Sequence, residues 1–183
     1  MKYIIEHIDP EIYDWSLMEY KHISKVVGKL NVIFTNIKNN KDKLRALGRV
    51  EEKQIKELKL KNACLLDPKA EKTLNPKDNF DYLIFGGILG DDPPQGRTEK
   101  AFTGLKCEKR NLGSVQMSTN TAVLVAKMIV DGRKFEEIKF VDELVIPVQE
   151  GEEIILPYRF VVKNGKPVLA DGYVEFVKEN EFH

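Results

Sequence analysis

Four short apolar runs, separated by polar or helical segments, constrain the fold of this sequence more than any other feature. They are residues 3–8, 31–35, 63–66 and 80–85. Runs of this length, rich in Ile, Leu, Val and Phe, are typical of buried strands. Strands that alternate with helical segments form parallel sheets covered by helices. The sequence therefore predicts an α/β fold built on a mostly parallel sheet.

Two further segments of the first half have helical features. Asp9-Pro10 has the form of an N-cap followed by proline at the first helical position. Apolar side chains then recur on one stripe between residues 11 and 27, and Gly28 stands where a C-terminal cap is expected. Residues 41–59 are charged, and we expect them to be helical in two pieces broken near Gly48.

The second half predicts one buried helix and a small β-rich end. Residues 122–130 are apolar almost all round, so a helix here must be buried. Ser118–Thr121 supply capping side chains at its start. Asn164-Gly165 lies between two apolar runs, which is the signature of a two-residue hairpin. We expect one domain over residues 1–142 and a small β appendage over 143–183.

The charge of the chain is balanced but unevenly distributed. Lys and Arg number 29, as do Asp and Glu, which argues against a protein that coats nucleic acid by bulk charge. Residues 38–61 carry nine basic and four acidic side chains, whereas residues 134–183 carry six basic and eleven acidic ones. Two interpretations stay open: both are solvated faces, or they form a basic patch for RNA and an acidic region for a basic protein. The sequence contains no apolar run of about 18 residues, so no membrane span is predicted.

Three loops carry the chemistry that the sequence offers, because ligands of parallel sheets bind where loops leave the carboxyl ends of the strands. The loops are residues 66–68, 86–94 and 110–117. The glycines of the second loop let the backbone approach a ligand closely, although a tight turn without a ligand explains them equally well. This loop does not match the dinucleotide-binding fingerprint, because Pro93-Pro94 stand where a helix would have to continue.

Charged residues near these loops are candidates for binding or proton transfer. Asp91 and Asp92 follow the glycine loop and could face a basic group, and Arg97 could hold a carboxylate or phosphate. Glu6, near the end of the first strand, is a candidate acid or base. Ordinary structural or surface polarity is the alternative for each. The two cysteines and three histidines lack metal-ligand spacing, so no metal site is predicted.

Several of these segments occur together in an order known from one family of enzymes. They are Tyr3–His7 (YIIEH), Leu65–Pro68 (LLDP), Phe85–Thr98 (FGGILGDDPPQGRT) and Leu112–Ala122 (LGSVQMSTNTA). The set resembles SPOUT-class methyltransferases that use S-adenosylmethionine, and among them the fungal enzyme that methylates an arginine of a small-subunit ribosomal protein, with its archaeal relatives. The resemblance covers residues 1 to about 178, with gaps around 37–60. The sequence departs from the fungal pattern at Asp92, where a histidine can occur.

The resemblance implies a sheet with a deep trefoil knot and S-adenosylmethionine bound in the loops of the knot. By position, the cofactor-binding residues are Leu65, Leu66, Asp67, Gly86, Gly87, Ile88, Leu89, Gly90, Leu112, Gly113, Val115, Met117 and Thr121. Thr119 and Thr121 would cap the helix beneath the cofactor. Glu6 and Asp91 are the candidates to orient a substrate guanidinium and accept its proton, and Arg97 would position a phosphate if the substrate were RNA.

The same resemblance implies direct methyl transfer to an arginine of a ribosomal protein. Two alternatives stay open: an RNA methyltransferase acting on rRNA or tRNA, and a non-catalytic ribosome-assembly factor. We expect the protein to be cytoplasmic and a monomer rather than a homodimer.

Overall fold

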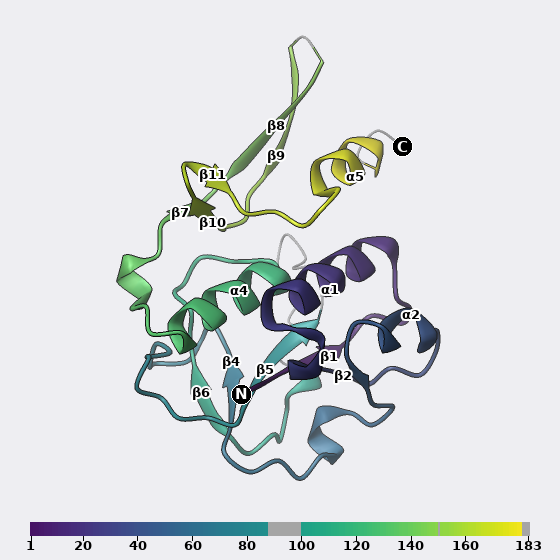
Figure 1. The fold of residues 1–183 in the computed structure, drawn as a ribbon, viewed down its shortest axis with the longest axis vertical. Helices are drawn as coiled ribbons and strands as arrows, with labels where there is room; N and C mark the ends of the chain where they lie inside the picture. Colours follow the sequence, from purple (N-terminus) through teal and green to yellow (C-terminus); the bar gives the residue numbers. More distant parts are fainter. Residues whose placement is uncertain (88–99, 150, 181–183) are drawn as a thin grey trace.

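The computed structural model describes residues 1–87, 100–149 and 151–180, and its centre is a six-stranded sheet (Figure 1). The strands are β1 (Lys2–His7), β2 (Val32–Thr35), β3 (Arg49–Val50), β4 (Ala63–Leu66), β5 (Tyr82–Gly87) and β6 (Glu108–Arg110). They lie in the order β3-β2-β1-β5-β4-β6, and every pairing is parallel. The predicted α/β fold with a parallel sheet is confirmed, and β3 and β6 are strands that the sequence patterns did not indicate.

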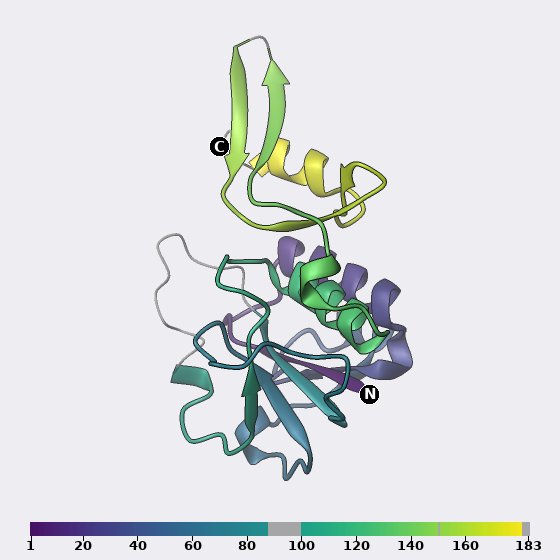
Figure 2. The same ribbon diagram turned by 90° about the vertical axis from the view of Figure 1, so that its left-hand side faces the viewer.

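Two helices, α1 (Asp14–Val27) and α4 (Thr119–Val130), lie side by side on one face of the sheet (Figures 1 and 2). The buried helix predicted over 122–130 is confirmed, and its apolar side chains belong to the main core. Gly28 ends α1 with a φ of 81°, as predicted for a C-cap. The predicted start at Asp9 is wrong, because the N-cap is Tyr13 and residues 8–13 form a connection instead.

The charged segment 41–59 is not two helices. It contains a single helical turn, α2 (Asp42–Arg45), then β3, then the 3-10 turn η2 (Ile55–Glu57). Gly48 explains the difference, because a Cβ at this position would lie 2.8 Å from the carbonyl oxygen of Val32. This close approach lets the chain pair with β2 as an edge strand, a tertiary contact that local charge patterns do not encode.

The other face of the sheet has a smaller core over β1, β4 and β5. It contains the buried side chains of Ile4, Ile55, Ala63, Leu65, Ile84 and Phe102. Short 3-10 turns, η1 (Lys29–Asn31) and η3 (Phe135–Glu137), complete the connections of the α/β part. Among the residues that the structure describes, no helix has both the length and the apolar character needed to cross a membrane.

The C-terminal residues form a small region above the helices (Figure 2). Its elements are β7 (Phe140–Val141), β8 (Leu144–Gln149), β9 (Glu152–Leu156), β10 (Phe160–Lys163), β11 (Lys166–Pro167) and α5 (Tyr173–Asn180). The hairpin at Asn164-Gly165 is confirmed, with φ values of 52° and 76°. This region has its own apolar cluster, which includes Ile146 and Phe160. Helix α5 was not predicted, and the domain boundary at residue 142 stays a prediction.

Candidate active site

The carboxyl ends of β1, β5, β4 and β6 lie at one edge of the sheet because these strands are adjacent and parallel. Gly86 and Gly87, at the end of β5, pair with Glu6 and His7 at the end of β1. Strand β4 pairs with β5 on one side and with β6 on the other. The strands that carry the three predicted loops therefore end side by side, as expected for a ligand site in a parallel sheet.

Hydrogen bonds fix the starts of these loops to one another. The backbone N–H of Asp67, after β4, donates to the carbonyl of Arg110 in β6 at 2.9 Å. The hydroxyl of Thr119, at the start of α4, donates to the carbonyl of Gly86 at 2.9 Å. The first residue of α4 is thus tied to the end of β5, and the segment after β4 is tied to the end of β6.

The predicted cofactor-binding residues differ in exposure. Leu66, Asp67, Gly86, Gly113, Val115 and Met117 are half-buried, whereas Leu65, Leu112 and Thr121 are buried. Gly87 ends β5. The buried side chains lie in the protein interior, so they would support a ligand from below rather than at the surface. Ile88, Leu89, Gly90, Asp91 and Arg97 lie outside the described residues.

Asp67 is held in place by two lysine-containing segments. Its Oδ1 accepts the backbone N–H of Lys69 at 2.9 Å, and its Oδ2 accepts the ammonium of Lys109 at 2.9 Å. Desolvation raises the pKa of Asp67, but these hydrogen bonds and the two lysine charges together outweigh it and hold the pKa below its ordinary value. Asp67 is therefore an ionised acceptor at neutral pH.

The loop after β6 is shaped by Gly113. This residue has a φ of 84°, and a Cβ there would lie 2.8 Å from Cζ of Phe135. Its backbone N–H donates to Oδ1 of Asn111 at 3.0 Å. Only glycine adopts this conformation without strain and without displacing the aromatic ring. The positive φ and the nearby ring of Phe135 thus explain why position 113 is a glycine.

The predicted capping of α4 by its own side chains is wrong. Ser118 occupies the N-cap position, but its hydroxyl lies near Oδ1 of Asn120 and Oγ1 of Thr121, not near a backbone N–H. Thr119 bonds the end of β5 instead. The helix is capped from outside, because the carboxyl group of Glu19 on α1 accepts the backbone N–H of Asn120.

Glu19 is thus a polar residue near this site that the sequence analysis did not identify. It is only 2% exposed, and burial raises its pKa to about 8, although the Asn120 N–H opposes the shift. The side-chain amide of Asn120 lies 2.9 Å from Nδ1 of His22, whose pKa burial lowers. The position of Glu19 on the apolar stripe of α1 was visible in the sequence. Its hydrogen-bond partner, Asn120, lies about a hundred positions further along the chain.

Glu6 is buried on the face of the sheet opposite α1. Its Oε2 accepts the Thr35 hydroxyl at 2.5 Å and the backbone N–H of Ile55 at 3.0 Å. Burial raises the pKa of Glu6, although both hydrogen bonds oppose the shift. A raised pKa makes the carboxylate a stronger base than an exposed one. Its role in catalysis stays a prediction.

His7, the last residue of β1, is a second polar residue at this edge. It is 4% exposed, its Nδ1 lies 2.8 Å from the hydroxyl of Tyr20, and its Nε2 lies 3.2 Å from the carbonyl of Glu11. The tautomer that satisfies both contacts has its proton on Nε2, so Nδ1 accepts from Tyr20. Burial lowers the pKa of His7, which keeps the ring neutral.

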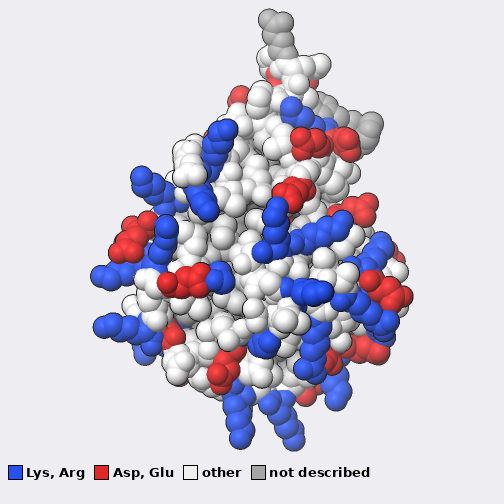
Figure 3. Space-filling model, viewed as in Figure 1, with Lys and Arg blue, Asp and Glu red and all other residues white. Residues whose placement is uncertain are grey.

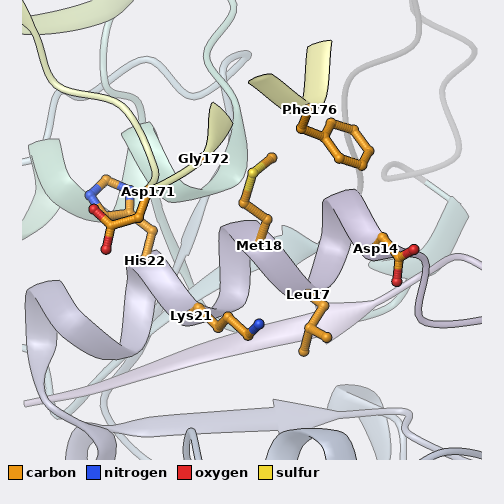
Figure 4. A pocket seen from close by; sticks show the side chains of 8 residues that line it. All are labelled: Asp14, Leu17, Met18, Lys21, His22, Asp171, Gly172 and Phe176. Carbon is orange, nitrogen blue, oxygen red and sulfur yellow. The ribbon is translucent and has the colours of Figure 1, made fainter. Parts of the chain in front are cut away.

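Two hollows lie near these residues. One, of about 270 Å³, is lined by residues 7–12, 36–39 and Gln54, which follow the carboxyl ends of β1 and β2 or precede η2. The other, of about 350 Å³, lies between α1 and α5, where Met18 points toward Phe176 and His22 lies beside Asp171 (Figure 4). Among the described residues, neither lining includes a predicted cofactor-binding or catalytic residue. The first hollow lies at the strand ends, whereas the second lies along α1 and the start of α5.

The residues at the strand ends fit a nucleoside-type cofactor. Half-buried apolar side chains such as Leu66 and Met117 can pack against a flat ring, and glycine-containing backbone at Gly86 and Gly113 allows a close approach. A parallel sheet with adjoining loops at its carboxyl edge is the architecture of α/β proteins that bind nucleotides and related ligands. The fold and the site together define a protein of that class.

Comparisons with known proteins identify the family. The chain matches the family described as protein arginine N-methyltransferase SFM1-like over residues 2–182. Protein arginine N-methyltransferase SFM1 of Saccharomyces cerevisiae is 36% identical over 204 residues, covering 98% of this chain and 95% of the relative. The chain belongs to the SFM1-like family of protein arginine N-methyltransferases.

Solved structures agree with this assignment. The crystal structure of the yeast arginine methyltransferase SFM1 complexed with SAM matches with a TM-score of 0.89 at 36% identity, covering 100% of this chain and 92% of that chain. A Trm10 from Thermococcus kodakaraensis matches with a TM-score of 0.56 at 19% identity, covering 75% of this chain and 96% of that chain. The second likeness shows a shared fold.

Proposed function

We propose that this protein is an S-adenosylmethionine-dependent protein arginine N-methyltransferase whose substrate is a ribosomal protein of the small subunit. The observation that carries the proposal is the 36% identity, over nearly the whole chain, to a yeast protein named as an arginine methyltransferase and solved with SAM. The gathering of the predicted loops at one sheet edge supports it.

The cofactor-binding residues are proposed to be those that follow β4, β5 and β6. Leu66 and Asp67, the glycines of residues 86–90, and the segment 112–117 would hold the nucleoside through backbone groups and apolar side chains. When bound, S-adenosylmethionine supplies a methyl group on a positively charged sulfur. We propose that the loops form the trefoil knot of the SPOUT class, which the fold likeness to Trm10 supports.

The protein's own residues have three tasks in such a reaction. They must align the arginine nitrogen with the methyl group, exclude water, and take up the proton that the guanidinium loses. Glu6 is a candidate for the proton acceptor because burial raises its pKa and its position pairs with Gly86. Asp91 and Arg97 are further proposed catalytic residues.

A protein substrate is favoured over RNA by the charge of the chain. The net charge is zero, and the segment 134–183 is acidic. On the face shown in Figure 3, acidic side chains lie among the lysines and arginines, and basic side chains predominate over the lower right part. The RNA alternative is favoured by this basic area and by the excess of basic residues in 38–61. We propose that the enzyme acts as a monomer in the cytoplasm.

Calorimetric titration with S-adenosylmethionine and with S-adenosylhomocysteine tests the cofactor part of this proposal. We expect saturable binding of both, with one site for each chain. A flat titration would contradict the proposal. Binding without transfer of labelled methyl groups to any ribosomal component would favour the assembly-factor alternative instead.

A further inference from the structure

We propose that the hollow at the carboxyl ends of β1 and β2 is the slot that receives the arginine side chain of the substrate. This inference rests on the proposed function and assigns its substrate-binding residues. The slot is lined by residues 7–12, 36–39 and Gln54, and its volume is about 270 Å³. That is slightly below the volume of pockets for drug-sized ligands, about 300–1,000 Å³, and suits a single long side chain.

The position of the slot places it beside the proposed cofactor site. Strand β1 lies between β2 and β5, so the slot occupies the sheet edge next to the end of β5. His7, which lines the slot, pairs with Gly87, where the proposed glycine loop begins. A substrate side chain in the slot would therefore lie at the ends of β1 and β2, and the cofactor would lie next to it at the ends of β5, β4 and β6. Methyl transfer requires such a side-by-side arrangement.

The slot offers the acceptors that a guanidinium needs. A guanidinium has five N–H donors and no acceptor. Asp9 and Glu11 supply carboxylates to the lining. Asn36 also lines the slot: its side-chain N–H₂ donates to the carbonyl of His7 at 2.7 Å, and its Oδ1 lies inward, out of reach of solvent. The carboxylates of Asp9 and Glu11 are therefore the acceptors that the slot offers, and the Asn36 amide fixes its wall against the end of β1.

The backbone and the neighbouring histidine hold this arrangement. Asn36 has a φ of 60°, and its own N–H donates to the carbonyl of Lys53 at 2.9 Å, which fixes the turn after β2. His7 is held by Tyr20 at 2.8 Å and is neutral, so it adds no positive charge beside an incoming cation. Among the described residues of the lining, Lys38 is the one Lys or Arg, and it is exposed.

The hollow between α1 and α5 is a poorer candidate. It lies along the helices rather than at the strand ends, and its lining combines Asp14 and Asp171 with Lys21 (Figure 4). Asp171 is already paired with Lys25 at 2.9 Å. An RNA phosphate would fit the strand-end slot poorly, because it would meet Asp9 and Glu11.

A probe experiment tests the slot without requiring enzyme activity. The full chain is titrated with N-ethylguanidinium, ethylammonium and inorganic phosphate in separate arms, and backbone and side-chain amide signals are followed by NMR. We expect saturable shifts in residues 7–12 and 36–39 with ethylguanidinium, with dissociation constants on the order of millimolar for so small a ligand. Ethylammonium should shift them less, and phosphate should leave them unchanged.

Variants decide whether the shifts report the slot. Glu11→Gln changes an exposed side chain and should weaken ethylguanidinium binding, as should Asp9→Asn. Asp171→Asn, in the other hollow, is the matched control and should bind the probe like the wild type. Shifts that appear elsewhere, stronger binding of phosphate, or binding that Glu11→Gln leaves unchanged would overturn the proposal.

Kinetics separate failure of the slot from failure of the proposed function. For Glu11→Gln we expect the KM for the protein substrate to rise about tenfold, with kcat within about twofold and with unchanged affinity for S-adenosylmethionine. Suppose that the wild type binds the cofactor and methylates arginine, but Glu11→Gln has the same KM as the wild type. That result contradicts the proposed slot and leaves the proposed function standing. A wild-type protein that does not bind the cofactor contradicts the proposed function, whatever the probe shows.

Discussion

The carboxyl group of Glu19, on α1, accepts a hydrogen bond from the backbone N–H of Asn120 in the first turn of α4. This contact joins the two helices that cover the sheet, at the place where the chain enters α4 from the proposed cofactor loop. The other carboxyl oxygen, Oε1, has no hydrogen-bond partner among the described residues. Because Glu19 is a buried acid, we expect the stability of this contact between α1 and α4 to depend on pH.

The first prediction concerns stability against pH. The pKa of Glu19 is about 8 in the folded chain, against an ordinary value of 4.5. Between these values the folded state binds more protons than the unfolded state, so the free energy of unfolding falls as pH rises. The slope is up to about 1.4 kcal/mol per pH unit for one such group. Chemical denaturation of the wild type and Glu19→Gln from pH 4.5 to 8.5 measures it.

Glu19→Gln keeps an acceptor oxygen for Asn120 but removes the titrating group. Its stability relative to the wild type should therefore increase as pH rises through this window. His7 and His22, whose pKa values are lowered by burial, contribute equally to both proteins and cancel in the comparison. Parallel stability curves for the two proteins would show that Glu19 does not titrate in this range.

The second prediction concerns the loop after β6. Gly113→Ala places a Cβ 2.8 Å from Phe135 in a backbone with a φ of 84°, whereas Gly104→Ala has a φ of 82° and open space around it. We expect Gly104→Ala to cost about 1–2 kcal/mol from backbone strain alone. Gly113→Ala should cost more and should also weaken S-adenosylmethionine binding in calorimetry. Equal losses of stability in the two variants, with unchanged cofactor affinity, would contradict the role given to Gly113.

The third prediction concerns the bond between His7 and Tyr20. Tyr20→Phe removes the hydroxyl that donates to Nδ1 of a buried imidazole, and should lower the free energy of unfolding by about 1–3 kcal/mol. Tyr13→Phe is the control, because Tyr13 is 43% exposed and should change stability little. Thermal and urea denaturation measure both. A Tyr20→Phe protein as stable as the Tyr13→Phe protein would exclude an energetically important bond.

The strands of the sheet could be predicted because each is a short apolar run with an evident end. Ala63–Leu66 was predicted with its observed bounds, and the hairpin at Asn164-Gly165 has the positive φ values that its sequence indicates. In contrast, β6 has the sequence Glu-Lys-Arg and lies at the sheet edge, where polar side chains reach solvent. Its pairing with β4 is a tertiary contact without a local hydrophobic signal.

The site could be predicted only in part, for a similar reason. The loops were identified because they follow recognisable strands and carry glycine. The capping of α4 by Glu19 and the contact of Asn36 with His7 join residues far apart in the chain, so no spacing pattern reveals them. A glutamate on an apolar helical stripe, such as Glu19, was the one available signal of a buried polar partner.

The most direct test of the proposed function is to find which molecule receives the methyl group. The protein is incubated with methyl-labelled S-adenosylmethionine and unmodified small ribosomal subunits, and the products are separated into protein and RNA before acid hydrolysis of the protein. We predict label in methylated arginine of a small-subunit ribosomal protein. Label in the RNA fraction, or no label in a protein that binds the cofactor, would contradict the account.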